Sequence, residues 1–211
     1  LYEVPIHLEG YDPTYKGHQG QIKKAATLIK NAKRPLIIAG AGVLKSGAMD
    51  ELKELAEKAQ IPVTNTLVGL GGFPGDHELA LGMVGMHGSV AANNSTDEAD
   101  LVIAAGIRFH DRITGHPDFF CKKAKIIHID IDPAEIDKNV TINVPIVGDL
   151  KQVLTELNAL VEPTTHEAWL EQIREWQAEY PMVIPESKNG VLHAQYVLSE
   201  LNKIAKDDAI I

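Results

Sequence analysis

The chain has 211 residues, of which 45% are hydrophobic and 23% charged, as in ordinary globular proteins. Its formal net charge of −9 argues against a nucleic-acid partner, because phosphate binding requires a basic face. No apolar run reaches the roughly 18 residues of a membrane span. One cysteine, Cys121, leaves no internal disulfide framework and suits a reducing compartment. We therefore expect a cytoplasmic protein without a membrane partner.

The pattern of apolar residues predicts helices and strands that alternate along most of the chain. An incoming linker is expected over residues 1–19, where prolines, glycines and tyrosines occur without a clear period. Helices are predicted at about 21–31, 48–59, 89–95 and 150–160. Strands are predicted at 35–39, 61–66, 100–105, 125–130 and 143–147. Because each strand is nearly all apolar, we expect an α/β fold, Rossmann-like, in which an open, doubly wound parallel sheet carries helices on both faces.

Two other parts of the chain depart from this alternation. Residues 67–88 are rich in glycine and lack strong periodicity, which is typical of a functional loop. Flanking amphipathic helices are predicted at 166–178 and 191–205. The first of these helices carries Trp169 and Trp176 on one face, which we interpret as a packing stripe against another domain.

The carboxyl ends of the predicted strands are where an open parallel sheet binds ligands. Gly40–Gly42 follows the first strand, and glycine lets backbone N–H groups approach a diphosphate closely. Thr66 offers a hydroxyl, and Arg108 can clamp a phosphate with its fork of donors. Asp130 and Asp149 can accept hydrogen bonds from ribose or ribityl hydroxyls. These groups suit a large dinucleotide, although glycines also end strands in any fold of this class.

The residues that would indicate other chemistry are absent or incomplete. The fingerprint for NAD fails, because Lys45 stands where its third glycine should be and the next predicted strand ends without an acidic residue. His128 lies inside an apolar strand and is interpreted as a core histidine rather than a base. The histidines and aspartates around His110 lack the partner set that defines a metal site. We expect no catalytic residue and no metal ligand in this chain.

Four short motifs, taken together and in this order, resemble the catalytic subunit of acetolactate (acetohydroxyacid) synthase. They are Thr66–Gly71, Gly85–Gly88, Gly106–Gly115 and His128–Ile136. The resemblance covers nearly the whole chain. It implies the central, FAD-binding domain of a thiamine-diphosphate-dependent transferase, which condenses two pyruvates to 2-acetolactate, or pyruvate with 2-oxobutyrate, in branched-chain amino-acid biosynthesis.

The resemblance also implies which residues contact the flavin. These cofactor-binding residues are Gly40, Ala41, Gly42, Thr66, Leu67, Val84, Gly85, Met86, His87, Gly106, Ile107, Arg108, Phe109, His110, Asp130, Ile131, Asp149 and Leu150. Arg112 and Met86 resemble positions beside the substrate channel. The family usually has Asp where this chain has His110, which leaves the side-chain part of that contact open but not its backbone part.

Thiamine diphosphate and Mg²⁺ are implied for the parent enzyme, at a site outside this chain. Their Gly-Asp-Gly motif does not occur here, because Gly75-Asp76-His77 and Gly148-Asp149-Leu150 both break the pattern. The chain also stops at Ile211, just inside what the pattern predicts as a new strand. We therefore expect a fragment that is not catalytic alone, cut from a homo-oligomer that acts on small 2-oxo acids, with or without a regulatory subunit.

The expected organisation has three parts. Residues 1–19 form the incoming linker, residues 20–161 the FAD-binding domain, and residues 162–211 the linker and helices that lead into the missing thiamine-diphosphate-binding domain. One alternative is a non-catalytic central scaffold domain of a related thiamine-diphosphate enzyme that binds no flavin. Another is an electron-transfer-flavoprotein-like domain on the same sheet topology. A sirtuin-like domain is excluded, since it needs paired Cys-x-x-Cys zinc ligands and the chain has one cysteine.

Overall fold

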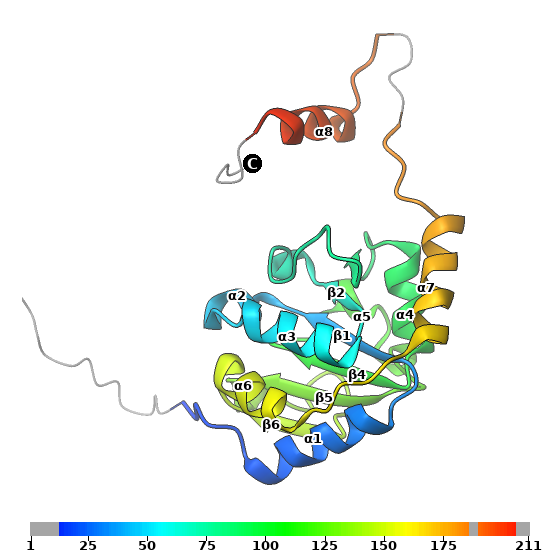
Figure 1. Ribbon diagram of the computed structural model, residues 1–211. Helices are drawn as coiled ribbons and strands as arrows, with labels where there is room; N and C mark the ends of the chain where they lie inside the picture. The colour runs from blue at the N-terminus through cyan, green and yellow to red at the C-terminus, as the bar shows by residue number, and fades with distance from the viewer. Residues whose placement is uncertain (1–12, 186–189, 206–211) are drawn as a thin grey trace, which may run out of the picture. The chain divides into compact units, whose positions relative to one another are not determined.

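A computed structural model describes residues 13–185 and 190–205 (Figure 1). The chain divides after Glu179 into two compact units. In the described part of the smaller unit lies helix α8 (Ala194–Ile204), whose apolar side chains are not buried. No helix in the described ranges is both long and apolar enough to cross a membrane. The candidate site belongs to the larger unit.

The centre of the larger unit is a six-stranded sheet in which every neighbouring pair of strands is parallel (Figure 1). Its strands are β1 (Pro35–Ala39), β2 (Val63–Asn65), β3 (Ala80–Met83), β4 (Leu101–Ala105), β5 (Lys125–Asp130) and β6 (Val144–Val147). Their order is β3-β2-β1-β4-β5-β6, so the direction of winding reverses between β1 and β4. The predicted open, doubly wound parallel sheet is confirmed.

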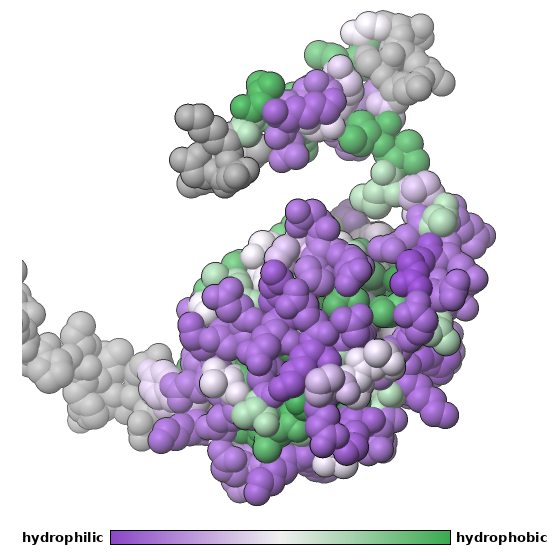
Figure 2. Space-filling view, viewed as in Figure 1, coloured by the Kyte–Doolittle hydropathy of each residue, from purple (hydrophilic) through white to green (hydrophobic). Residues whose placement is uncertain are grey.

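Helices cover both faces of this sheet. They are α1 (Gln19–Asn31), α2 (Ala41–Ser46), α3 (Met49–Ala59), α4 (Val90–Glu98), α5 (Asp111–Thr114), α6 (Leu150–Leu160) and α7 (Glu167–Glu179), with short 3-10 helices at Leu67–Gly69, Pro117–Phe119 and Pro133–Glu135. One core cluster packs α1, α2, α3 and α6 on one face, and a second packs α4 and α7 on the other. The face of this unit that is visible in Figure 2 is mainly hydrophilic.

The continuous apolar runs of the sequence follow from this two-sided burial. Along β1, Ile37 contributes to the first core cluster, whereas Leu36 and Ile38 contribute to the second. Successive side chains of a strand point to opposite faces. All five residues of β1 are therefore buried, and a polar residue at any of them would need a partner inside a core.

The glycine-rich segment 67–88 differs from its prediction as a loop. It contains β3, which pairs parallel to β2 with Val63 beside Ala80. The prediction missed this strand because β3 is a short edge strand interrupted by Gly82, whose φ of 77° lies in the left-handed region. The predicted strand 61–66 is also too long, since β2 covers only Val63–Asn65.

Trp169 packs inside the larger unit rather than against a separate domain. Its side chain is only 4% exposed and belongs to the second core cluster. Its indole Nε1 donates a hydrogen bond of 3.0 Å to the carbonyl oxygen of Pro35, at the start of β1. The Trp176 ring meets it edge to face at 5.8 Å. The tryptophan stripe therefore attaches α7 to the sheet.

Candidate functional site

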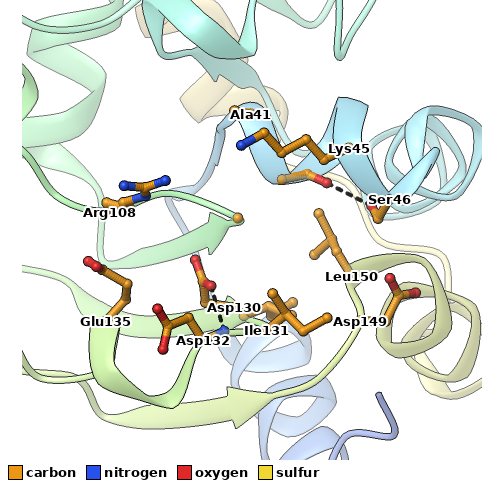
Figure 3. A pocket seen from close by; sticks show the side chains of 13 residues that line it. Ala41, Lys45, Ser46, Arg108, Asp130, Ile131, Asp132, Glu135, Asp149 and Leu150 are labelled. Atoms are coloured by element: carbon orange, nitrogen blue, oxygen red, sulfur yellow. Dashed lines mark hydrogen bonds between the residues drawn. The ribbon is translucent and has the colours of Figure 1, made fainter. Parts of the chain in front are cut away.

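A cavity of about 330 Å³ lies at the carboxyl edge of the sheet, where the winding reverses (Figure 3). The segments that follow β1, β4, β5 and β6 line it. This is the place at which open parallel sheets bind ligands. Eight of the predicted cofactor-binding residues line the cavity, namely Ala41, Gly42, Gly106, Arg108, Asp130, Ile131, Asp149 and Leu150.

The backbone at Gly42 and the backbone at Gly106 are in close contact where they line the cavity, and we call this contact the floor of the cavity. The amide nitrogen of Gly42 donates to the carbonyl oxygen of Gly106 across 3.1 Å. A Cβ atom on Gly42 would lie 2.6 Å from the Cα of Gly106, and one on Gly40 would collide with the Gly106 carbonyl. Glycine is therefore required at positions 40 and 42, because a side chain there would prevent the close approach of the two backbone segments at the ends of β1 and β4.

Two cations from different elements flank the cavity. Arg108 follows β4, and Lys45 comes from α2, so that the two cations line the cavity from different elements (Figure 3). In the ranges that the structure describes, neither side chain takes part in a hydrogen bond or an ion pair. Lys45 was considered from the sequence only as a break in the NAD fingerprint, because the six-residue helix α2 that presents it had not been predicted. Both side chains are therefore available to pair with an anionic ligand.

Carboxylates line the side formed by β5 and β6. Asp130 Oδ1 accepts a hydrogen bond of 2.9 Å from the amide of Asp132, and burial is the main cause that raises the pKa of Asp130. Asp149 caps α6, since its Oδ1 accepts from the amide of Gln152 at 3.1 Å. Asp132 and Glu135 complete this side and were not predicted. The cavity is thus divided into a cationic and an acidic part.

Thr66 lies outside the lining of this cavity but has an unusual feature. Its side chain is only 2% exposed, and its Oγ1 has no hydrogen-bond partner among the described residues. Its backbone amide donates to the Ala39 carbonyl at 2.9 Å, so the residue is fixed at the carboxyl ends of β1 and β2. A buried hydroxyl without a partner is uncommon in a folded protein and suits a group supplied by a ligand.

The two residues predicted beside the substrate channel meet through their backbones. The amide nitrogen of Met86 donates to the carbonyl oxygen of Arg112 across 3.0 Å. Gly85 permits this contact, because a Cβ atom there would collide with that carbonyl and its φ is 103°. The side chains of Met86 and Arg112 are exposed. The structure therefore brings these two segments together, outside the lining of the cavity.

The remaining predicted residues do not line the cavity. They are Gly40, Leu67, Val84, Gly85, His87, Ile107, Phe109 and His110. The side chains of Val84, Ile107 and Phe109 belong to the second core cluster, so only their backbones are available to a ligand. Leu67, His87 and His110 are exposed.

His128 is confirmed as a core histidine. It is fully buried, and its Nε2 lies 2.8 Å from the carbonyl oxygen of Ile107. Burial is the largest influence on its pKa and lowers it, so the ring is neutral near pH 7. Among residues 13–185 and 190–205, no group of three His, Cys, Asp or Glu residues is arranged to hold a metal ion.

Comparison with known proteins identifies the family. Residues 22–157 match the family described as the thiamine pyrophosphate enzyme, central domain. The chain is 56% identical over 179 residues to the probable acetolactate synthase large subunit of Methanocaldococcus jannaschii, covering 82% of the chain and 30% of that relative. It is 45% identical over 214 residues to the acetolactate synthase of Mycobacterium avium, covering 97% and 34%.

A third relative covers the whole chain. The acetolactate synthase large subunit of Buchnera aphidicola is 41% identical over 215 residues, which covers 100% of the chain and 38% of that relative. The chain thus spans 30–38% of the length of these relatives. The resemblance inferred from the motifs is confirmed. The chain belongs to the thiamine pyrophosphate enzyme family, of which it carries the central domain.

Proposed function

We propose that this chain is the FAD-binding central domain of an acetolactate synthase large subunit. The observation that carries the proposal is the divided cavity at the reversal of the sheet, with Arg108 and Lys45 on one part and carboxylates on the other. FAD carries a diphosphate between two polyhydroxylated groups, so it needs cations and hydroxyl acceptors close together. The same cavity lies in a domain whose relatives are named acetolactate synthases.

The residues present fit this group. Arg108 and Lys45 would hold the diphosphate, and Asp130 would accept from sugar hydroxyls. Thr66 would gain a partner for its buried Oγ1. A cavity of about 330 Å³ is at the small end of ligand pockets, so it suits one part of a dinucleotide rather than the whole.

The chain's own residues would bind and orient the cofactor. By the resemblance, FAD bound here supplies no net redox chemistry. Arg108 would fix the diphosphate through charge-assisted hydrogen bonds, and the backbone contact of Gly42 with Gly106 would keep the floor rigid. The apolar side chains of Ile131 and Leu150 would exclude water beside the acidic part.

The activity of the whole enzyme forms a further part of the proposal. The parent would condense two pyruvates, or pyruvate with 2-oxobutyrate, in the cytoplasm, with thiamine diphosphate and Mg²⁺ bound outside this chain. It would be a homo-oligomer, with or without a regulatory subunit. Residues 20–161 would form the FAD-binding domain, residues 1–19 the incoming linker, and residues 162–211 the connection to the thiamine-diphosphate-binding domain.

Titration of the purified chain with FAD, and separately with NAD, tests the proposal. Quenching of flavin fluorescence reports FAD binding, and isothermal calorimetry compares the two ligands on one scale. We expect FAD to bind more tightly, because the fingerprint for NAD is incomplete at Lys45. Tighter binding of NAD, or no binding of FAD at millimolar concentration, would contradict the proposal and favour a scaffold domain without flavin.

A further inference from the structure

The segment Gly106–His110 presents Arg108 to the cavity without the support of a helix or a strand. Ile107 and Phe109 are each only 2% exposed, whereas Arg108 between them is exposed. Phe109 has a φ of 45°, in the left-handed region that residues with a side chain seldom adopt. A strained conformation of this kind persists only where surrounding contacts hold it.

The first of these contacts comes from the buried histidine of β5. His128 Nε2 lies 2.8 Å from the carbonyl oxygen of Ile107, directly before Arg108. The ring of Phe109, directly after Arg108, meets the His128 ring edge to face, with centroids 5.0 Å apart and an interplanar angle of 74°. One imidazole therefore contacts both neighbours of Arg108.

The chemistry of the contact defines the state of the imidazole. A carbonyl oxygen only accepts, so Nε2 must carry the hydrogen and donate it. Burial lowers the pKa of His128, which keeps the ring neutral and leaves Nδ1 without a hydrogen. Nδ1 has no partner in the described part of the chain. The hydrogen bond to the Ile107 carbonyl and the carboxylates of Asp130, Glu135 and Asp137 raise this pKa, but burial, which lowers it, is the larger influence.

The second contact comes from the loop between β5 and β6. Asn139 Nδ2 donates to the carbonyl oxygen of Phe109 at 3.2 Å and to that of Arg108 at 3.3 Å. The Asn139 side chain is exposed and takes no part in either core cluster. Three successive carbonyl groups, from Ile107 to Phe109, are thus held by side chains of other segments.

We propose that His128 and Asn139 are positioning residues, which hold the segment Gly106–His110 so that Arg108 faces the ligand of the cavity. The inference rests on the proposed function, because the ligand that Arg108 would meet is FAD. Neither residue lines the cavity. Because Asn139 holds the carbonyl groups of Arg108 and Phe109, removing its contacts should weaken FAD binding only while Arg108 is present. His128 Nε2 also lies 3.9 Å from Oδ2 of Asp130, which lines the cavity, so the dependence on Arg108 is tested with Asn139.

A double-mutant cycle in the full chain tests this dependence. Asn139→Ala should weaken FAD binding about fivefold, the effect of one neutral hydrogen bond. In the Arg108→Ala background the same substitution should change the dissociation constant by less than about twofold. Asn31→Ala is the matched control, because Asn31 is an exposed asparagine whose Nδ2 also donates to a carbonyl, that of Thr27 in α1. Equal effects of Asn139→Ala in both backgrounds would overturn the inference.

His128 variants separate positioning from packing. His128→Gln keeps an N–H donor at this position and should retain FAD affinity within about twofold. His128→Leu fills the volume without a donor and should weaken binding about fivefold or more. Loss of affinity in His128→Leu that is not rescued in His128→Gln, at matched thermal stability, would contradict a role for the donor.

A measurement without ligand keeps the inference independent of FAD. Amide hydrogen exchange of residues 106–110 should be faster in Asn139→Ala than in Asn31→Ala. Unchanged exchange in that segment would overturn the anchoring, whether or not FAD binds. If wild-type chain fails to bind FAD while the exchange rates differ as expected, the proposed function fails and the anchoring of the segment stands.

Discussion

Gly42 and Gly106 lie backbone against backbone where β1 and β4 end, with a hydrogen bond of 3.1 Å between amide and carbonyl. The contact leaves no room for a side chain, since a Cβ atom on Gly42 would lie 2.6 Å from the Gly106 Cα. It brings the segment of Ala41 and Lys45 to that of Arg108, and so forms the cavity. The site thus depends on a contact between residues far apart in the sequence.

Gly42→Ala is expected to destabilise the fold by about 1–3 kcal/mol, the usual cost of forcing extra atoms into a packed interior. Urea unfolding followed by circular dichroism measures the change. Gly75→Ala is the matched control, because a Cβ atom there has nothing within 4 Å and the backbone of Gly75 is not left-handed. Equal stability of the two variants would show that the β1 and β4 ends separate without cost.

Trp169→Phe is expected to cost about 1–3 kcal/mol of unfolding free energy, because the variant removes the donor to the Pro35 carbonyl and leaves space in the second core cluster. Trp176→Phe should cost clearly less, since Trp176 is only half-buried. Denaturant titration of both variants decides the point. A larger loss of unfolding free energy in Trp176→Phe than in Trp169→Phe would contradict the view that Trp169 attaches α7 to the sheet.

The stability of the protein should depend on the charge state of His128. Burial lowers its folded-state pKa below the ordinary value of 6.5. The unfolded chain therefore takes up the proton first as the pH falls, so stability that is present above pH 6.5 is lost as the pH falls below it. The loss from this one group is at most about 1.4 kcal/mol per pH unit.

Unfolding free energies measured from pH 7.5 to 5 test this dependence. The glutamine of His128→Gln does not titrate in that range, so this variant should give a flatter curve, while His166, whose pKa is also lowered by burial, contributes to both curves. Asp130 acts in the opposite sense, because its pKa is raised and the folded protein takes up its proton before the unfolded chain does as the pH falls towards the ordinary value of 3.8. Parallel curves for the wild type and His128→Gln would show that His128 accepts a proton in the folded protein as readily as in the unfolded chain.

The 211-residue chain, supplied with thiamine diphosphate, Mg²⁺ and pyruvate, is expected to form no acetolactate. The sequence lacks the Gly-Asp-Gly motif that, by the resemblance, holds Mg²⁺ and the diphosphate of thiamine diphosphate in the parent enzyme. A colorimetric assay for acetoin after acid decarboxylation detects the product, with a full-length relative as the positive control. Product above the enzyme-free background would mean that the catalytic site is not confined to other domains.

The strands that are buried on both faces could be predicted from the sequence. β1 and β4 were predicted from runs such as Pro35–Ala39, because residues that alternate between two cores are all apolar. The edge strand β3 could not be predicted, since it has only four residues and Gly82 interrupts it, whereas the other edge strand, β6, has no glycine and was predicted. The pattern of β3 is too weak to distinguish from a loop.

The candidate site was predicted in part for a similar reason. Arg108, Asp130 and Asp149 follow recognisable strands, so their common edge could be inferred. Lys45 and Glu135 could not, because their places over the cavity depend on short helical segments and on the contact of Gly42 with Gly106. The resemblance also implies flavin contacts at Ile107 and Phe109. Their side chains belong to the core, which the sequence did not reveal, so a contact to a ligand there would come from the backbone.

The affinity of FAD for the wild-type chain, for Arg108→Ala and for Arg174→Ala tests the central claim most directly. Arg174 is the matched control, because it is an exposed arginine of α7 that pairs with Glu167, away from the cavity. Fluorescence titration should show binding that weakens by about 1.5–3 kcal/mol in Arg108→Ala, the usual range for a hydrogen bond to a charged group. Arg174→Ala should bind FAD as the wild type does. Equal affinity of Arg108→Ala and the wild type would contradict the account, because the unpaired cation at the end of β4 would then have no part in holding the flavin.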